Sequence, residues 1–279
     1  MVTATEIQPA VHAPRHVTAI VTGAARGMGR AMTLGLAAAG VRVAAADLPS
    51  SRAEMDELLD TARRQGVADN VFPVDCDVTR WEDCAKAVQA AIDRFGAVHG
   101  LVNNAGIRVL DADLTKGGRH GRFYEHDTET WRRVVETNIV GPFQMAKAVA
   151  PVLVAQGWGR IVNITTSHST MVAQSFSPYG PTKAAMEAAT VIWAKDLAGT
   201  GVTVNALLPG GAGNTRMIPQ ADVPDRSTLI QPEVMMAPIA WLMSAASDGV
   251  TGRRFIAKQW DPALDPAAAA AKAGAPAGW

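Results

Sequence analysis

Tyr179 and Lys183 are four residues apart and carry side chains that can exchange a proton together. In a helix this spacing places both side chains on one face. A tyrosine with its ordinary pKa of about 10 is a poor base at neutral pH, but a nearby ammonium favours the phenolate. Such a pair also occurs on solvated helix surfaces, so the residues around it decide whether it is catalytic. The two residues are candidates for general acid/base catalysis.

A glycine-rich segment, residues 22–29 (TGAARGMG), follows the first apolar run and leads into a helical pattern. Gly23 permits a tight turn, and Gly27 and Gly29 let the backbone approach a pyrophosphate. The helix N-terminus adds unpaired N–H groups and a positive dipole end. Glycine turns also serve as plain connectors, but this one lies between strand and helix, where a dinucleotide-binding fold requires it.

Asp47 follows at the end of the second apolar run. A carboxylate there can accept hydrogen bonds from an adenosine ribose and repels a 2′-phosphate; its alternative role is to cap the following helix. Arg26 favours NADP instead, because a guanidinium beside the phosphate cradle can hold a 2′-phosphate. The balance favours NAD as the cofactor, with NADP as the alternative.

Short apolar runs alternate with helical patterns along the chain, which implies right-handed crossovers and a parallel sheet covered on both faces. The predicted strands are 16–21, 41–46, 71–74, 100–103, 160–164, 202–207 and 254–257, and the predicted helices are 28–39, 52–65, 80–95, 128–155, 179–198 and 232–246. We therefore predict an α/β fold, a single Rossmann-like doubly wound domain over residues 16–261 with a mostly parallel, seven-stranded sheet. Ligands of such folds bind beyond the carboxyl ends of the strands. Pro142 should kink or interrupt its helix.

The two ends of the chain differ from this pattern. Residues 1–15 are polar and aperiodic, and we interpret them as a flexible N-terminal arm. Residues 262–279 form an Ala/Pro-rich C-terminal tail, either flexible or docked on a partner subunit.

Composition excludes several classes of protein. Lys+Arg and Asp+Glu both number 26 in 279 residues, so no net charge attracts the chain to nucleic acid or to an anionic membrane. Cys76 and Cys84 are too few for a disulfide framework and lack metal-ligand spacing. No apolar run reaches the roughly 18 residues of a membrane span, and residues 1–15 contain no apolar signal core. We expect a cytoplasmic protein without a metal, a membrane or a nucleic-acid partner.

The motifs occur in a specific order: the glycine segment, Asn103-Asn104-Ala105-Gly106, Asn138, the Tyr179/Lys183 pair and Pro209-Gly210. Over residues 16–257 this order resembles the short-chain dehydrogenase/reductase family. The resemblance implies an NAD(P)-dependent oxidoreductase. It would transfer a hydride between nicotinamide and a secondary alcohol or ketone of a small organic substrate, and would assemble as a homotetramer or homodimer.

The resemblance also implies residue roles. Tyr179 would exchange a proton with the substrate oxygen, Lys183 would bind the nicotinamide ribose and lower the pKa of Tyr179, and Asn138 would hold a water. Asp77 would accept a hydrogen bond from the adenine amine. The implied cofactor contacts are Gly23, Arg26, Gly27, Met28, Gly29, Asp47, Asp77, Val78, Asn104, Ala105, Gly106, Tyr179, Lys183, Pro209 and Gly210.

The chain departs from the family at three places. Thr166 stands thirteen residues before Tyr179, where the family usually has serine. Its hydroxyl can still hold the substrate oxygen, and the neighbouring Ser167 is the alternative. Residues 110–127 form a long insertion with basic residues, and residues 259–261 replace a glycine-rich end of the sheet.

The insertion bears on the substrate. Lys116, Arg119 and Arg122 could grip a carboxylate or phosphate, or the segment could be a solvated loop or a subunit contact. The residues expected to face the substrate are Ile107, Arg108, His168, Met171, Gln174, Phe176 and 211–218.

A catalytically weak nucleotide-binding sensor or scaffold is the alternative function. Thr166 and the altered end of the sheet support it, whereas the joint presence of Asn138, Tyr179 and Lys183 argues against it.

Overall fold

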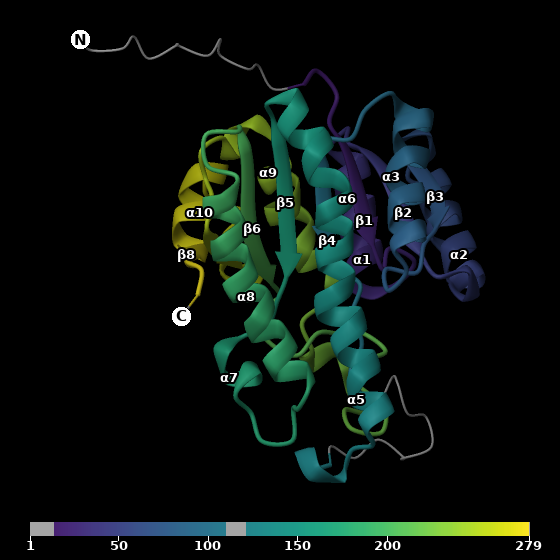
Figure 1. Cartoon of the computed structure of the whole chain (residues 1–279), viewed down its shortest axis with the longest axis vertical. Helices are drawn as coiled ribbons and strands as arrows, with labels where there is room; N and C mark the ends of the chain where they lie inside the picture. Colours follow the sequence, from purple (N-terminus) through teal and green to yellow (C-terminus); the bar gives the residue numbers. More distant parts are fainter. Residues whose placement is uncertain (1–13, 110–120, 279) are drawn as a thin grey trace.

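The computed structural model describes residues 14–109 and 121–278. An eight-stranded sheet has the order β3-β2-β1-β4-β5-β6-β7-β8, and only β8 runs antiparallel to its neighbour (Figure 1). The strands are β1 Thr18–Thr22, β2 Arg42–Asp47, β3 Val71–Asp75, β4 Gly100–Asn103, β5 Gly159–Ile164, β6 Val202–Leu208, β7 Arg253–Ile256 and β8 Gly274–Pro276. The strand order reverses between β1 and β4, as in doubly wound folds, so the predicted α/β class is confirmed.

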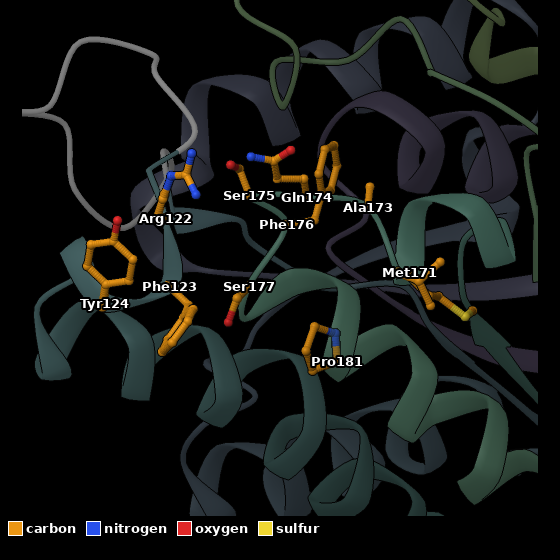
Figure 2. A pocket seen from close by; sticks show the side chains of 11 residues that line it. Arg122, Phe123, Tyr124, Met171, Ala173, Gln174, Ser175, Phe176, Ser177 and Pro181 are labelled. Carbon is orange, nitrogen blue, oxygen red and sulfur yellow. The ribbon is translucent and has the colours of Figure 1, made fainter.

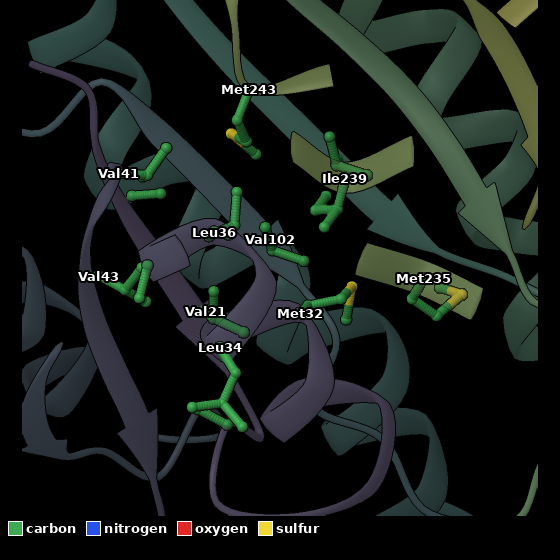
Figure 3. Close-up of a cluster of buried hydrophobic side chains, with 14 of the residues drawn as sticks. Val21, Met32, Leu34, Leu36, Val41, Val43, Val102, Met235, Ile239 and Met243 are labelled. Atoms are coloured by element: carbon green, nitrogen blue, oxygen red, sulfur yellow. The ribbon is translucent and has the colours of Figure 1, made fainter. Parts of the chain in front are cut away.

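Helices cover both faces of the sheet. They are α1 Gly27–Ala38, α2 Arg52–Arg64, α3 Trp81–Phe95, α5 Thr128–Val135, α6 Gly141–Gln156, α7 His168–Met171, α8 Tyr179–Asp196, α9 Met236–Leu242 and α10 Pro266–Ala273. One buried apolar cluster packs α1, α2 and α9 against the sheet. Figure 3 shows side chains of this cluster from α1 and α9 beside those of the strands. A second cluster packs α3, α6 and α8 against the opposite face. Strand β1 is buried along its whole length because both of its faces are covered.

The helical stretch that was predicted over residues 128–155 is interrupted. A π-helical turn, Glu136–Val140, separates α5 from α6, and Pro142 lies in the first turn of α6. Proline lacks an N–H group and disturbs the preceding turn, as expected from the sequence. Asn138 is buried within this turn.

Residues 128–156 are also, among the described residues, the one helical stretch long and apolar enough to span a membrane. The finding is weak evidence of a span, because this stretch covers the sheet and core helices pass the same test.

The sheet has eight strands and not the predicted seven, because the segment predicted as a C-terminal tail contributes one. Asp265 caps α10 by accepting hydrogen bonds from the N–H groups of Ala267 and Ala268, and the chain then enters β8. Strand β8 pairs with β7 and covers the edge that β7 would otherwise expose. An Ala/Pro-rich sequence carries little periodic apolar signal, so its pattern did not reveal the helix or the strand. The predicted arm, residues 1–15, lies almost wholly outside the described residues.

Candidate active site

The glycine segment forms a cradle between β1 and α1. Gly23 and Gly27 have φ angles of 63° and 54°, in the left-handed region that favours glycine. A Cβ on Gly29 would overlap the carbonyl oxygen of Gly23. The side-chain amide of Asn104 donates to the carbonyls of Thr22 and Gly23 at 2.9 and 3.0 Å, which braces the turn. The open backbone and the N-terminus of α1 suit a dinucleotide pyrophosphate.

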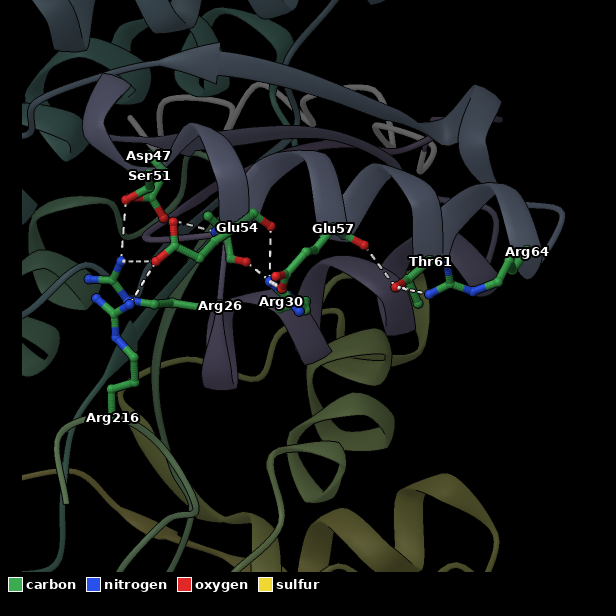
Figure 4. Close-up of polar contacts among 10 residues, drawn as sticks. Arg26, Arg30, Asp47, Ser51, Glu54, Glu57, Thr61, Arg64 and Arg216 are labelled. Atoms are coloured by element: carbon green, nitrogen blue, oxygen red, sulfur yellow. Dashed lines mark hydrogen bonds and ion pairs between the residues drawn. The ribbon is translucent and has the colours of Figure 1, made fainter. Parts of the chain in front are cut away.

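Asp47 lies beside this cradle at the end of β2. Its carboxylate is 9% exposed and accepts hydrogen bonds from the N–H groups of Ala25 and Leu48, both at 2.8 Å. It therefore ties the end of β2 to the glycine segment and does not cap α2. Because Asp47 accepts from the N–H of Ala25, it lies next to Arg26, the residue that favours NADP. The Arg26 guanidinium donates to the hydroxyl of Ser51 at 3.3 Å (Figure 4).

Tyr179 and Lys183 lie on the first turns of α8, as their spacing predicts. The Lys183 ammonium is 5.8 Å from the centre of the Tyr179 ring and donates to the Ile164 carbonyl at the end of β5. Burial lowers the pKa of Lys183 to about 8. A buried ammonium held beside a phenol is suited to stabilise a phenolate.

Asn138 links three elements around this pair. Its amide oxygen accepts from the N–H of Ile107 at 2.8 Å, and its amide nitrogen donates to the Ile107 carbonyl and to the hydroxyl of Thr182. Gly106 lies against the side chains of both Asn138 and Lys183, since an added Cβ would lie 3.2 Å from the Asn138 oxygen and 3.5 Å from the Lys183 nitrogen. The π-turn, the segment after β4 and α8 thus meet around Lys183.

The two candidates for holding the substrate oxygen have different surroundings. The Ser167 hydroxyl caps α7 by accepting from the N–H of Thr170, and it contacts the hydroxyl of Ser169 at 2.9 Å. The Thr166 hydroxyl makes no hydrogen bond within the part of the chain that the structure describes. The two hydroxyls therefore differ, in that Ser167 is engaged in capping α7.

The remaining predicted residues lie at the same edge of the sheet. The Asp77 carboxylate, after β3, accepts from the N–H and hydroxyl of Thr79, while the Val78 side chain packs against α6. Gly210, after Pro209 and β6, has a φ of 95°. The predicted cofactor residues thus gather at the carboxyl ends of β1 to β6.

The loop after β6 reaches over the cradle, which the sequence did not predict. A Cβ on Gly27 would lie 3.2 Å from the methyl group of Thr215, and Met28 packs against Gly213. The Arg226 guanidinium braces the loop by donating to the carbonyls of Thr215 and Ile218. No local pattern marks these contacts, since they join residues from distant parts of the chain.

A cavity of about 340 Å³ lies beside the start of α8 (Figure 2). Its lining includes Arg122 from the insertion and the predicted substrate-facing residues Met171, Gln174 and Phe176. The other predicted substrate-facing residues, Ile107, Arg108, His168 and 211–218, are not in its lining. Figure 2 shows the polar side chains of Arg122, Gln174 and Ser175 on one side of the cavity. Lys116 and Arg119 lie outside the described residues.

Comparisons with known proteins agree with this geometry. Residues 17–223 match the family model for short chain dehydrogenases. The chain is 32% identical over 243 residues to the 3-oxoacyl-[acyl-carrier-protein] reductase FabG of Thermotoga maritima, covering 84% of this chain and 93% of the relative. It is 37% identical over 194 residues to the 2-(R)-hydroxypropyl-CoM dehydrogenase of Xanthobacter autotrophicus, covering 69% and 73%.

Solved structures are similar as well. A gluconate 5-dehydrogenase from Burkholderia cenocepacia, in complex with NADP and tartrate, has a TM-score of 0.73 at 27% identity, covering 86% of this chain and 92% of that one. A 3-ketoacyl-(acyl-carrier-protein) reductase from Brucella melitensis, complexed with NADH, has a TM-score of 0.71 at 25% identity, covering 84% and 93%. The chain therefore belongs to the short-chain dehydrogenase family of NAD(P)-dependent oxidoreductases.

Proposed function

We propose that this protein uses NAD(H) to interconvert a secondary alcohol and a ketone on a small organic substrate. The observation that carries the proposal is that the segment after β4 lies against both the cradle, at Gly23, and the buried Lys183 ammonium, which lies beside Tyr179. A proton-exchanging pair next to a dinucleotide site is what a reaction coupling hydride and proton transfer needs.

In the proposed mechanism, the Tyr179 hydroxyl exchanges a proton with the substrate oxygen. Lys183 stabilises the phenolate form of Tyr179, and the Thr166 hydroxyl donates a hydrogen bond to the same oxygen, where charge develops. Asn138 holds the segment after β4 against α8 and so positions Lys183. A bound nicotinamide supplies or accepts the hydride.

The preference for NAD(H) over NADP(H) rests on Asp47. Its carboxylate lies at the end of β2 beside the cradle, where a 2′-phosphate would meet a negative charge. Arg26, which could neutralise that phosphate, is already paired with Glu54 at 3.6 Å.

The substrate is proposed to have an apolar body and a polar or anionic group, because the cavity combines Met171 and Phe176 with Arg122 and Gln174. We also propose a cytoplasmic homotetramer or homodimer. Support for the assembly comes from the exposed apolar side chains of Phe143 on α6 and Ile192 on α8, which are 51% and 55% exposed.

The test begins with titration of the purified protein with NADH and NADPH, followed by nicotinamide fluorescence. Tighter binding of NADH, weakened or reversed by Asp47→Ala, would support the cofactor assignment. Secondary alcohols and ketones are then screened, and any turnover should fall sharply in Tyr179→Phe. Cofactor binding without turnover of any such substrate would favour the sensor or scaffold, and binding of neither cofactor would contradict the proposal.

A further inference from the structure

Glu54 joins two guanidiniums that come from distant parts of the chain. It lies in the first turn of α2, and one of its carboxylate oxygens pairs with Arg216 at 2.7 Å and with Arg26 at 3.6 Å. Arg26 belongs to the glycine cradle, and Arg216 belongs to the loop after β6. The carboxylate is ionised, since hydrogen bonding to the main chain and the two guanidiniums lower the pKa of Glu54.

This cluster lies where the adenosine ribose of a dinucleotide is expected. Arg26 also donates to the buried hydroxyl of Ser51, and Figure 4 shows Asp47 and Ser51 beside the Glu54 carboxylate and the two guanidiniums. Asp47 is the residue at the end of β2 to which the sequence assigns the ribose. Charges in the cluster therefore act on the ribose 2′ position.

The charges of the cluster balance. The Glu54 carboxylate faces the two guanidiniums, Arg26 and Arg216, and Asp47 adds a second carboxylate, which is held by the N–H groups of Ala25 and Leu48. A 2′-phosphate brings up to about two negative charges and would need both guanidiniums, which bind phosphate well. As long as Glu54 pairs with them, a phosphate gains little and meets two carboxylates. A ribose with a free 2′-hydroxyl avoids this conflict.

We propose that Glu54 is a specificity-determining residue that reserves the adenosine end of the site for NAD(H) by pairing with Arg26 and Arg216. The inference rests on the proposed function, namely that the chain binds a nicotinamide dinucleotide at the cradle. It adds that the two guanidiniums are able to hold a 2′-phosphate once Glu54 no longer occupies them.

The test is the substitution Glu54→Gln, which removes the negative charge of the side chain and keeps its shape. Dissociation constants for NADH and NADPH are measured by nicotinamide fluorescence on the wild-type protein and the variant. Glu57→Gln is the matched control, because Glu57 lies on the same helix and pairs with a different arginine, Arg30, at 2.9 Å. We expect Glu54→Gln to tighten NADPH binding by about tenfold, with NADH binding changed by less than about twofold and Glu57→Gln without effect.

A second set of variants tests whether the guanidiniums of Arg26 and Arg216 cause the tighter binding of NADPH. In the triple variant Glu54→Gln/Arg26→Ala/Arg216→Ala the tighter binding of NADPH should disappear. Glu54→Ala, which also removes the charge, should raise the affinity for NADPH relative to NADH in the same direction as Glu54→Gln.

Several results would overturn the inference. An unchanged NADPH-to-NADH ratio in Glu54→Gln, an equal change in Glu57→Gln, or a gain that persists in the triple variant would each do so. So would a wild-type protein that binds NADPH more tightly than NADH. Failure of the wild-type protein to bind either cofactor would instead refute the proposed function, so the two failures are distinguishable.

Discussion

The Lys183 ammonium donates a hydrogen bond of 2.8 Å to the main-chain carbonyl of Ile164. This bond attaches α8 to the carboxyl end of β5, and it holds a buried positive charge 5.8 Å from the centre of the Tyr179 ring. Lys183, one member of the proposed catalytic pair, is thus oriented by the sheet as well as by its own helix.

Activity should depend on the protonation of Lys183. Burial lowers the pKa of this ammonium to about 8, from an ordinary value of 10.5. The charged, active form therefore predominates below pH about 8, and kcat/KM should fall above it as the neutral amine stops stabilising the phenolate. A pH profile of kcat/KM reports the free enzyme. In Lys183→Arg, whose guanidinium stays charged, the alkaline limb should move to higher pH; an unmoved limb would assign it to another group.

The neighbouring hydroxyls of Thr166 and Ser167 should differ in their effects. Thr166→Val removes a proposed donor to the substrate oxygen and should lower kcat/KM by about a hundredfold, whereas Thr166→Ser should retain most of the activity. Ser167→Ala removes the cap of α7 and should cost about 1 kcal/mol in the free energy of unfolding, with kcat/KM largely kept. Steady-state kinetics and urea unfolding measure both effects, and the reverse pattern would assign the oxygen to Ser167.

A methyl group on Gly29 should disrupt the cradle. It would overlap the Gly23 carbonyl and approach the side-chain nitrogen of Asn104 to 2.7 Å, so Gly29→Ala should weaken NADH binding by about a hundredfold or more. Ala38→Gly, at the far end of the same helix, serves as the control. It should lower stability by about 1 kcal/mol and leave the NADH dissociation constant unchanged. Normal NADH affinity in Gly29→Ala would show that the cradle does not contact the cofactor.

A buried ion pair supports the residue before Thr166. The Glu187 carboxylate is fully buried, accepts from the Thr165 hydroxyl at 2.8 Å and pairs with Arg254 at 3.6 Å. Glu187→Gln leaves the Arg254 charge without its partner and should lower the free energy of unfolding by about 3 kcal/mol. The double variant Glu187→Gln/Arg254→Met should recover part of that loss in urea unfolding. Strictly additive losses would show that the two side chains do not interact.

The basic insertion can be tested through Arg122, which lines the cavity beside α8. Arg122→Ala should raise KM for substrates that carry a carboxylate or phosphate and leave KM for neutral substrates unchanged, because a guanidinium suits anions. Kinetics with matched anionic and neutral alcohols measure the difference. An unchanged KM for both kinds of substrate would leave the insertion as a solvated loop or a subunit contact.

Local sequence patterns determined much of the architecture. The glycine turn, the end of β2 at Asp47 and the spacing of Tyr179 and Lys183 each depend on residues that are close along the chain. Apolar runs alternating with helical periods indicate a parallel, doubly wound sheet, because right-handed crossovers leave few topologies. The α/β fold and the gathering of the predicted residues at one edge of the sheet followed from these signals.

Only the tertiary structure decided the contacts between distant residues. Arg216 and Glu54 are 162 positions apart, and neither has a local pattern that indicates the other. The engagement of Ser167 in capping depends on the short helix that follows it. Strand β8 forms because folding leaves the edge of β7 open to pair with it. An Ala/Pro-rich segment has no preference for a strand by itself. Its backbone N–H and C=O groups find partners on β7 only after the sheet has formed.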